Sequence, residues 1–334
     1  MIKFLNNELE DINEIIRLVA MKESLPEAII EKDMWVSYLL DYLFNRCQYR
    51  DYFEFKGGTS LSKGYGVINR FSEDVDIVVN ASVFIDIDIK DVLKLPSKTQ
   101  KQKKAEQLNE LALSFYKDKL IPVMQSDIES EINKDITVSI SEEELAIYVT
   151  YPCTYKDTYI NSSVKLEIGP LAAWTPNEER KISSFIQEIY PDLCAKPDFP
   201  VLITLPKRTF WEKAIILHQE ANRKDGNLPR RYSRHYYDLY RMYATNIKKD
   251  ALKDQNLLDE VREFTMTFYY RSWSEFEKAK PGTFRLYPND MYISELEADY
   301  EQMRKMIFGD DVPTFMEVLG VIKQLEHEIN MMKE

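Results

Sequence analysis

The chain has 334 residues, of which 44% are hydrophobic and 30% charged, and its formal net charge is −12. This composition is typical of a soluble globular protein, and the acidic balance disfavours general adhesion to nucleic acid, because such adhesion depends on Lys and Arg side chains that meet phosphates. No apolar run approaches the roughly 18 residues of a membrane span, and the first ten residues are too charged for a signal peptide, so we expect a cytoplasmic protein with no membrane partner.

The first part of the chain predicts two helices. Apolar residues at helical spacing, among them Ile12, Ile16 and Val19, indicate a helix over residues 9–21. Residues 24–27, Ser-Leu-Pro-Glu, are typical of a capping box and indicate a second helix that ends near residue 45. We expect both helices to pack on a sheet formed by later residues rather than to make a domain of their own.

The next stretch predicts most of that sheet. Alternating or continuously apolar runs indicate strands at residues 53–55, 74–79, 136–140, 146–151 and 163–168. The third and fourth runs are separated by a short polar segment and predict an antiparallel hairpin. Between the second and third runs, a lysine-rich helix is expected over residues 98–119.

The rest of the chain is mostly helical in pattern. Thr175-Pro176-Asn177-Glu178 is typical of a helix cap, and a short strand follows at residues 201–203. Beyond Pro206 the spacing predicts helices over residues 209–222, 233–244, 251–272 and 293–307, and from 314 to the end. We therefore predict an α+β (mixed α/β) fold, in which residues 1–205 form a mixed sheet flanked by helices and residues 206–334 form an all-helical C-terminal domain.

A glycine turn and two carboxylates suggest the first chemistry. Residues 57–60, Gly-Gly-Thr-Ser, predict a tight turn and a helix start whose hydroxyls and N–H groups can hold phosphate oxygens. Asp74 and Asp76 lie two residues apart on a predicted strand, so they share a face with Cα atoms about 6–7 Å apart. Two like charges on an apolar strand favour a hard cation, Mg²⁺ or Mn²⁺, together with a nucleoside triphosphate (NTP). The alternatives are a plain turn and a solvated carboxylate pair.

Three further residues are candidates for catalytic or binding roles. Glu167 points away from its apolar neighbours on a later strand and could be a third carboxylate that binds metal and helps to deprotonate an attacking hydroxyl; otherwise it is solvated. Lys213 leaves a largely apolar helix surface, either to contact a triphosphate or to pair with Glu212 in solvent. Asp238 could form helix salt bridges with Arg234 and Arg241, and could also orient Lys213 or a substrate group.

One segment is basic in spite of the acidic whole. Residues 223–241 contain six Lys or Arg and two Asp, a local balance of +4, interleaved with four tyrosines. Single-stranded nucleic acid uses such a mixture for phosphate contact and base stacking, so Arg230, Arg231 and Arg234 are candidate RNA-binding residues. The alternative is a helix whose tyrosines pack inward and whose arginines are solvated.

The motifs resemble a known family. The pattern Gly-Gly-Thr-Ser-Leu, followed by Arg-x-Ser-x-Asp-x-Asp, is similar to the first motif of polymerase-beta-type nucleotidyltransferases, in the form carried by the AbiEii/AbiGii toxins. Residues 165–169, 209–218 and 234–240 resemble later blocks of that family in the same order. The resemblance implies a metal site at Asp74, Asp76 and Glu167, and catalytic roles for these three, Lys213 and Asp238. The nucleotide-binding residues that it implies are Gly57, Gly58, Thr59, Ser60, Arg70, Ser72 and Lys213.

The resemblance also implies a reaction. A nucleotide would pass from an NTP to an RNA 3′ end, which is that of tRNA in characterised relatives, by in-line attack of a 3′-hydroxyl on the α-phosphate with loss of pyrophosphate. The protein would be the toxin of an abortive-infection or toxin–antitoxin system, with an antitoxin that need not contact it. The alternatives are the same chemistry on a protein or small-molecule hydroxyl, a nucleotide-binding module without turnover, and a purely structural helical protein.

Overall fold

The computed structural model describes residues 1–72, 74–157, 160–171, 175–224, 226, 228–309 and 311–332. The chain divides into two compact units. The sheet unit comprises Met1–Tyr65, Phe71–Val92 and Lys103–Thr204, and the helical unit comprises Gly66–Arg70, Leu93–Gln102 and Leu205–Glu334. Across the described residues, none of the helices has the length and apolar character that crossing a membrane requires.

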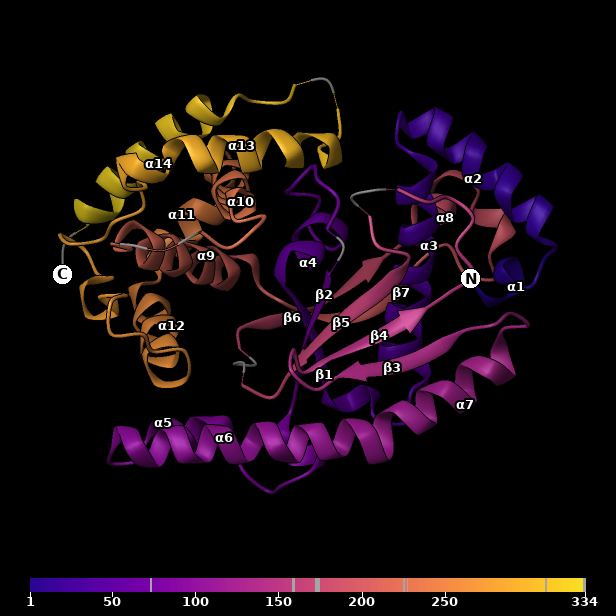
Figure 1. Cartoon of the computed structure of the whole chain (residues 1–334), viewed down its shortest axis with the longest axis horizontal. Coiled ribbons are helices and arrows are strands. Elements are labelled where there is room, and N and C mark those ends of the chain that lie inside the picture. The colour runs from indigo at the N-terminus through magenta and orange to yellow at the C-terminus, as the bar shows by residue number, and fades with distance from the viewer. Residues whose placement is uncertain are drawn as a thin grey trace. The chain divides into compact units, whose positions relative to one another are not determined.

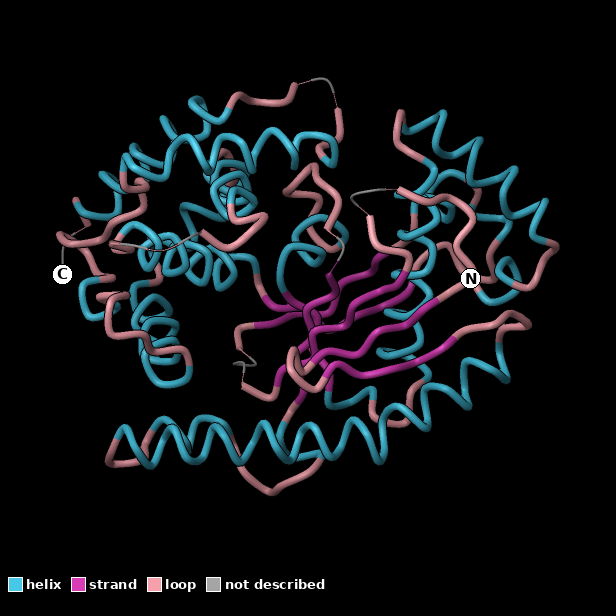
Figure 2. Tube along the Cα trace, viewed as in Figure 1, coloured by secondary structure: helices cyan, strands magenta, loops and turns pink. Residues whose placement is uncertain are grey.

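The sheet unit contains a seven-stranded mixed sheet in the order β3-β4-β5-β2-β1-β7-β6 (Figures 1 and 2). Its strands are β1 Phe53–Lys56, β2 Asp74–Val79, β3 Thr137–Ser141, β4 Ala146–Thr150, β5 Ser163–Gly169, β6 Asn177–Ile182 and β7 Phe199–Thr204. The pairs β2–β5 and β1–β7 are parallel, and the other neighbours are antiparallel. The predicted mixed α/β class and the predicted hairpin, β3–β4, are confirmed.

The α-helices of the first 204 residues lie mainly in the sheet unit, and several of them contribute apolar residues to its main core. They are α1 Ile2–Leu5, α2 Leu9–Glu23, α3 Glu27–Asp41, α4 Gly57–Lys63, α5 Ile89–Leu93, α6 Lys98–Phe115, α7 Ile121–Glu131 and α8 Phe185–Ile189. Figure 1 shows α3 crossing the strands and α7 running beside β3. Alternate residues of the central strands, such as Val75, Ile77, Leu166 and Ile168, belong to one apolar core with α2 and α3, so the predicted packing of these two helices on the sheet is confirmed.

Two local predictions for the sheet unit are wrong, and a third, the helix over residues 98–119, is confirmed but too short. Ser24 does not cap α3, because it ends α2 in a left-handed conformation (φ 55°), and Pro26 is the first residue before α3. Asn177–Ile182 is a strand rather than a helix, since it pairs with β7 at the edge of the sheet, where a polar strand is tolerated. The helix after residue 98 continues beyond residue 119 through a π-helical turn, Tyr116–Leu120, into α7, which the sequence did not predict.

The helical unit contains six longer helices in its described part. These are α9 Pro206–Ala221, α10 Ser233–Tyr243, α11 Asn246–Lys253, α12 Gln255–Phe268, α13 Ile293–Met303 and α14 Phe315–Asn330. Helix α9 packs on α10, α11 and α12, and α10 packs also on α13 and α14. The single helix predicted over residues 251–272 is wrong: Asp254 interrupts it, and its carboxylate accepts the Leu257 N–H to start α12.

Candidate active site

Gly57 brings the start of α4 close to β2. Its φ is +79°, which favours glycine, and a Cβ placed on it would lie only 1.9 Å from Oδ2 of Asp76. Any side chain here would therefore collide with the Asp76 carboxylate. The glycine turn and the second aspartate of the motif are thus packed against each other.

The two hydroxyls after the glycines are buried and bond to the backbone. Thr59 Oγ1 donates to the Asp74 carbonyl oxygen at 2.5 Å and lies 3.5 Å from the Ser72 carbonyl oxygen. Ser60 Oγ donates to the Gly57 carbonyl oxygen at 2.9 Å. Thr59 therefore ties α4 to the start of β2, and Ser60 closes the turn. Their contact with a triphosphate, and that of Gly58 and Ser72, stays a prediction.

Three carboxylates lie on one face of two adjacent strands. In the parallel pair β2–β5, Asp74 lies opposite Lys165 and Asp76 opposite Glu167. Residues at opposed positions share a face, and neighbouring strands lie about 4.8 Å apart. As the alternation predicts, Glu167 points to the face opposite its buried neighbours Leu166 and Ile168. Asp74, Asp76 and Glu167 therefore point away from the main core.

Lysines are interleaved with these carboxylates. Lys56 of β1 lies opposite Asp76, and Lys165 Nζ donates to Glu167 at 2.7 Å and to Glu144 at 2.9 Å. Burial acts to lower the pKa of Lys165, but the bonds to Glu167 and Glu144 outweigh it and raise that pKa. The sequence analysis missed both lysines, although their two-residue spacing from carboxylates on the same strands, or in register across strands, was the available signal.

The donor set on this face fits a hard cation by its chemistry, since its anionic ligands are all carboxylate oxygens. As they stand, however, no three His, Cys, Asp or Glu side chains within the described residues come together as a group that could hold a metal ion. Glu167 is held by Lys165, and its side chain is 42% exposed. The assignment of Asp74, Asp76 and Glu167 as metal ligands stays a prediction.

A second group of predicted residues comes together within the helical unit. Arg70 donates to both carboxylate oxygens of Asp238, from Nε at 2.7 Å and from the terminal nitrogen at 2.8 Å. Lys213 Nζ lies 2.7 Å from Oδ2 of the same carboxylate. Arg70 is 3% exposed, Lys213 6% and Asp238 0%, so two cations share one carboxylate in a buried setting.

Burial and the neighbouring charges shift the pKa values of Asp238 and Lys213. Burial acts to raise the pKa of Asp238, but Arg70 and Lys213 outweigh it and hold that pKa well below its usual range. Burial lowers the pKa of Lys213 below its ordinary value of 10.5, and Arg70 and Arg234 add to this effect against the opposing attraction of Asp238. With both cations protonated, the formal charges of Arg70, Lys213 and Asp238 sum to +1.

These contacts add other partners to two of the structural alternatives. Asp238 forms its ion pairs with Arg70 and Lys213, whereas Arg241 Nε donates to the carbonyl oxygen of Val67. Lys213 is buried, and Glu212 accepts instead from Arg208 on the previous turn. The sequence analysis named Lys213 as a possible partner of Asp238 and Arg70 as a nucleotide-binding residue, but it did not predict the pairing of Arg70 with Asp238, since 168 residues separate the two.

The comparison with protein families decides the assignment. The family described as nucleotidyl transferase AbiEii toxin, type IV toxin–antitoxin system, matches residues 38–321. The chain belongs to this family. It is therefore a nucleotidyltransferase toxin of a type IV toxin–antitoxin system, an enzyme class that takes an NTP and usually a divalent metal ion, and its system includes an antitoxin.

Two further comparisons accompany this result. The chain is similar to the solved structure of MenT4, a nucleotidyltransferase toxin of Mycobacterium tuberculosis, with 16% identity and a TM-score of 0.44 over 94% of this chain and 98% of that chain. Comparison with curated protein sequences gives no match.

The predicted RNA-binding arginines of this AbiEii chain differ in setting. Arg230 is exposed, and Arg231 is partly buried with φ +60° and donates its backbone N–H to Asp299 at 2.6 Å. Arg234 is partly buried at the start of α10. Tyr236 and Tyr237 are buried, so the inward-packing interpretation holds for these two and they are closed to base stacking. The RNA role of the three arginines stays a prediction.

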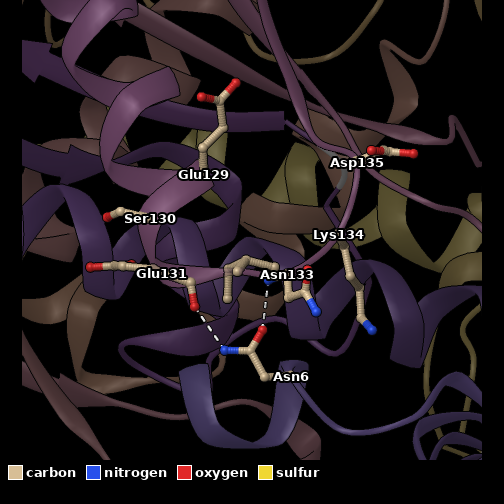
Figure 3. Close-up of a pocket in the computed structure, with 8 residues that line it drawn as sticks. Asn6, Glu129, Ser130, Glu131, Asn133, Lys134 and Asp135 are labelled. Carbon is tan, nitrogen blue, oxygen red and sulfur yellow. Dashed lines mark hydrogen bonds between the residues drawn. The ribbon is translucent and has the colours of Figure 1, made fainter.

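A surface hollow of about 520 Å³ lies elsewhere in the sheet unit (Figure 3). Its lining includes Asn6, which donates to the Glu131 carbonyl oxygen at 2.7 Å and accepts the Asn133 N–H at 2.8 Å. The hollow is lined by residues that follow α1 and end α7, and it shares no residue with the carboxylate face. The Asn6 side chain joins its own segment to the backbone at the end of α7, so these bonds support the fold of the sheet unit.

Proposed function

We propose that this AbiEii chain transfers a nucleoside monophosphate from an NTP to the 3′ end of an RNA, with tRNA as the acceptor, and that the reaction depends on Mg²⁺ or Mn²⁺. The observation that carries the proposal is the placement of Asp76 opposite Glu167, on the same sheet face as Asp74 and against the Gly57 turn. An enzyme that moves a nucleotide needs carboxylates of this kind beside a phosphate-binding turn.

Each group of residues has a proposed role. Asp74, Asp76 and Glu167 would hold the divalent cation, which when bound neutralises charge on the triphosphate and eases ionisation of the attacking hydroxyl. The backbone N–H groups of the turn at Gly57 and Gly58 would hold phosphate oxygens. The acceptor 3′-hydroxyl forms a new bond to the α-phosphorus as the bond to pyrophosphate breaks.

The cationic residues are proposed to act on phosphates. Lys213 and Arg70 would neutralise charge on the nucleotide phosphates, and Asp238 would orient both of them through the ion pairs described above. Arg230, Arg231 and Arg234 would contact the RNA backbone. This basic segment supports RNA over a protein or small-molecule acceptor, because the chain as a whole is strongly acidic.

The test incubates the purified protein with total tRNA, Mg²⁺ and each α-labelled NTP in turn. We expect label in the RNA with one or two of the NTPs, loss of that label in EDTA, and loss in Asp76→Asn. Asp118→Asn changes an exposed carboxylate of the same unit and serves as the matched control, which should label RNA as the wild type does. Label on protein instead of RNA, or transfer that persists in EDTA, would contradict the proposal.

A further inference from the structure

Three consecutive charged residues of α3 are buried in the sheet unit. Glu31 is 3% exposed, Lys32 1% and Asp33 2%. Successive residues of a helix point in directions about 100° apart, so α3 is enclosed on most sides at this level. Buried charges cost free energy unless they are paired, and apolar residues of similar volume often give equal or greater stability. These three side chains must therefore be held by hydrogen bonds or ion pairs.

Glu31 and Lys32 hold the two ends of the segment between β4 and β5. The Glu31 carboxylate accepts the backbone N–H groups of Thr154 at 2.8 Å and of Tyr155 at 3.0 Å. Lys32 Nζ donates to the carbonyl oxygens of Asn161 at 2.8 Å and of Ser163 at 2.5 Å. Ser163 is the first residue of β5, so these bonds fix the point at which that strand starts.

Asp33 holds the other end of the helix that carries the glycine turn. One carboxylate oxygen lies 2.5 Å from Nζ of Lys63, the last residue of α4, and the other accepts the Phe185 N–H at 2.9 Å. Lys63 also donates to the Ser183 carbonyl oxygen at 2.9 Å. The far end of α4 is therefore clamped between α3 and the start of α8.

We propose that Glu31, Lys32 and Asp33 are positioning residues for nucleotidyl transfer. Glu31 and Lys32 set the register and direction of β5, and hence of Glu167, whereas Asp33 sets α4, and hence the turn at Gly57. Helix α3 packs on the core face of the sheet, while Asp76 and Glu167 point to the opposite face, so the triplet acts on the site through the backbone. The inference rests on the proposed function and adds three residues that would position its catalytic groups without contacting the substrate.

Substitutions of Lys32 and of Asp33 should have different effects, the first on kcat and the second on nucleotide affinity. Lys32→Met should lower kcat about 10- to 100-fold and leave nucleotide affinity nearly unchanged, because residues that orient ligands typically have effects of this size. Asp33→Asn keeps an acceptor for the Phe185 N–H but removes the charge that faces Lys63, and it should weaken binding of an α,β-methylene NTP, measured in EDTA, about 10-fold. Lys32→Met should also speed amide hydrogen exchange in β5, and Lys32→Arg should restore part of kcat.

The matched control is Glu131→Gln. Glu131 is a partly buried carboxylate of the same unit that accepts from Arg46 at 2.9 Å and from Tyr38 at 2.8 Å, without contact to α4 or β5 among its described bonds. It should lower the melting temperature without splitting kcat from nucleotide affinity. Lys63→Met, which removes the partner of Asp33 at a more exposed position, repeats the Asp33 test if Asp33→Asn does not fold.

The outcomes separate this inference from the proposed function. The positioning role would be overturned by a normal kcat in folded Lys32→Met or by unchanged amide exchange in β5. It would also be overturned if activity fell only in proportion to the melting temperature, as expected for Glu131→Gln. Absence of RNA labelling by the wild type would instead overturn the RNA acceptor. The nucleotide-binding and hydrogen-exchange measurements need no turnover, so they decide the positioning role in either case.

Discussion

The two groups of candidate residues solve the problem of concentrated charge in opposite ways. On the sheet, Asp74, Asp76 and Glu167 are partly exposed and interleaved with lysines, so water and counter-ions share the cost of their charge. In the helical unit, the cluster of Arg70, Lys213 and Asp238 is buried, and its members depend on one another. From this difference we expect substitutions on the sheet face to lower activity with little loss of stability, whereas loss of the shared carboxylate in the buried cluster should lower both activity and stability.

The strongest test of this contrast is Asp238→Asn. The substitution leaves the Arg70 and Lys213 side chains, which are 4% and 7% exposed, without their shared carboxylate. We expect a loss of about 3–5 kcal/mol in the free energy of unfolding, because the two buried cations then lose the carboxylate that they share. Urea denaturation followed by circular dichroism measures it. Asp76→Asn, at the sheet face, should change the same quantity by less than about 1 kcal/mol.

Lys213→Met is the matched variant within the cluster. It leaves the two-bond pair of Arg70 and Asp238 intact, with one positive and one negative charge. Stability should therefore stay close to that of the wild type, while nucleotidyl transfer falls about 10²- to 10³-fold, the range typical of a lost electrostatic contact in the transition state. Equal losses of stability in Lys213→Met and Asp238→Asn would mean that the cluster is structural only.

The same contrast explains what the sequence could and could not predict. The carboxylates of the sheet face could be predicted from the sequence, because Asp74 and Asp76 lie two residues apart on one strand and the glycine turn lies nearby in the chain. The pairing of Arg70 with Asp238 could not be predicted, since it joins residues 168 positions apart that only the fold brings together. Strand β6 was missed because its polar residues pair at an edge, where apolar periodicity is absent.

Gly57→Ala tests the sheet face at its tightest contact. An Ala Cβ would collide with Oδ2 of Asp76 and would hold a backbone φ of +79° that costs about 1–2 kcal/mol. Transfer should fall about 10²-fold, since a shift of about 1 Å in a catalytic group has effects of this size. Gly66→Ala is the control, because Gly66 has φ +59° and an added Cβ would meet no heavy atom within 4 Å beyond the neighbouring residues of the chain. It should show the strain in its melting temperature and keep its activity.

The smallest expected effect is on stability in acid. All three histidines of the chain lie beyond residue 205, so their titration concerns the helical unit and not the sheet unit. His235 lies among Lys213, Arg234, Arg70 and Asp238, and its buried Nδ1 has no hydrogen-bond partner among the described atoms. Burial, together with Lys213 and Arg234, lowers the pKa of His235 well below 6.5.

The unfolded chain therefore binds a proton at His235 that the folded chain does not, once the pH falls below about 6.5. The free energy of unfolding should decrease by at most about 1.4 kcal/mol per pH unit from 6.5 down to the lowered pKa, and it should be constant in this respect above 6.5. His235→Gln cannot titrate and should flatten this slope in urea titrations between pH 7 and pH 5. An unchanged slope would place the acid sensitivity at His218, whose pKa burial also lowers, and would leave the charge cluster insensitive to pH in this range.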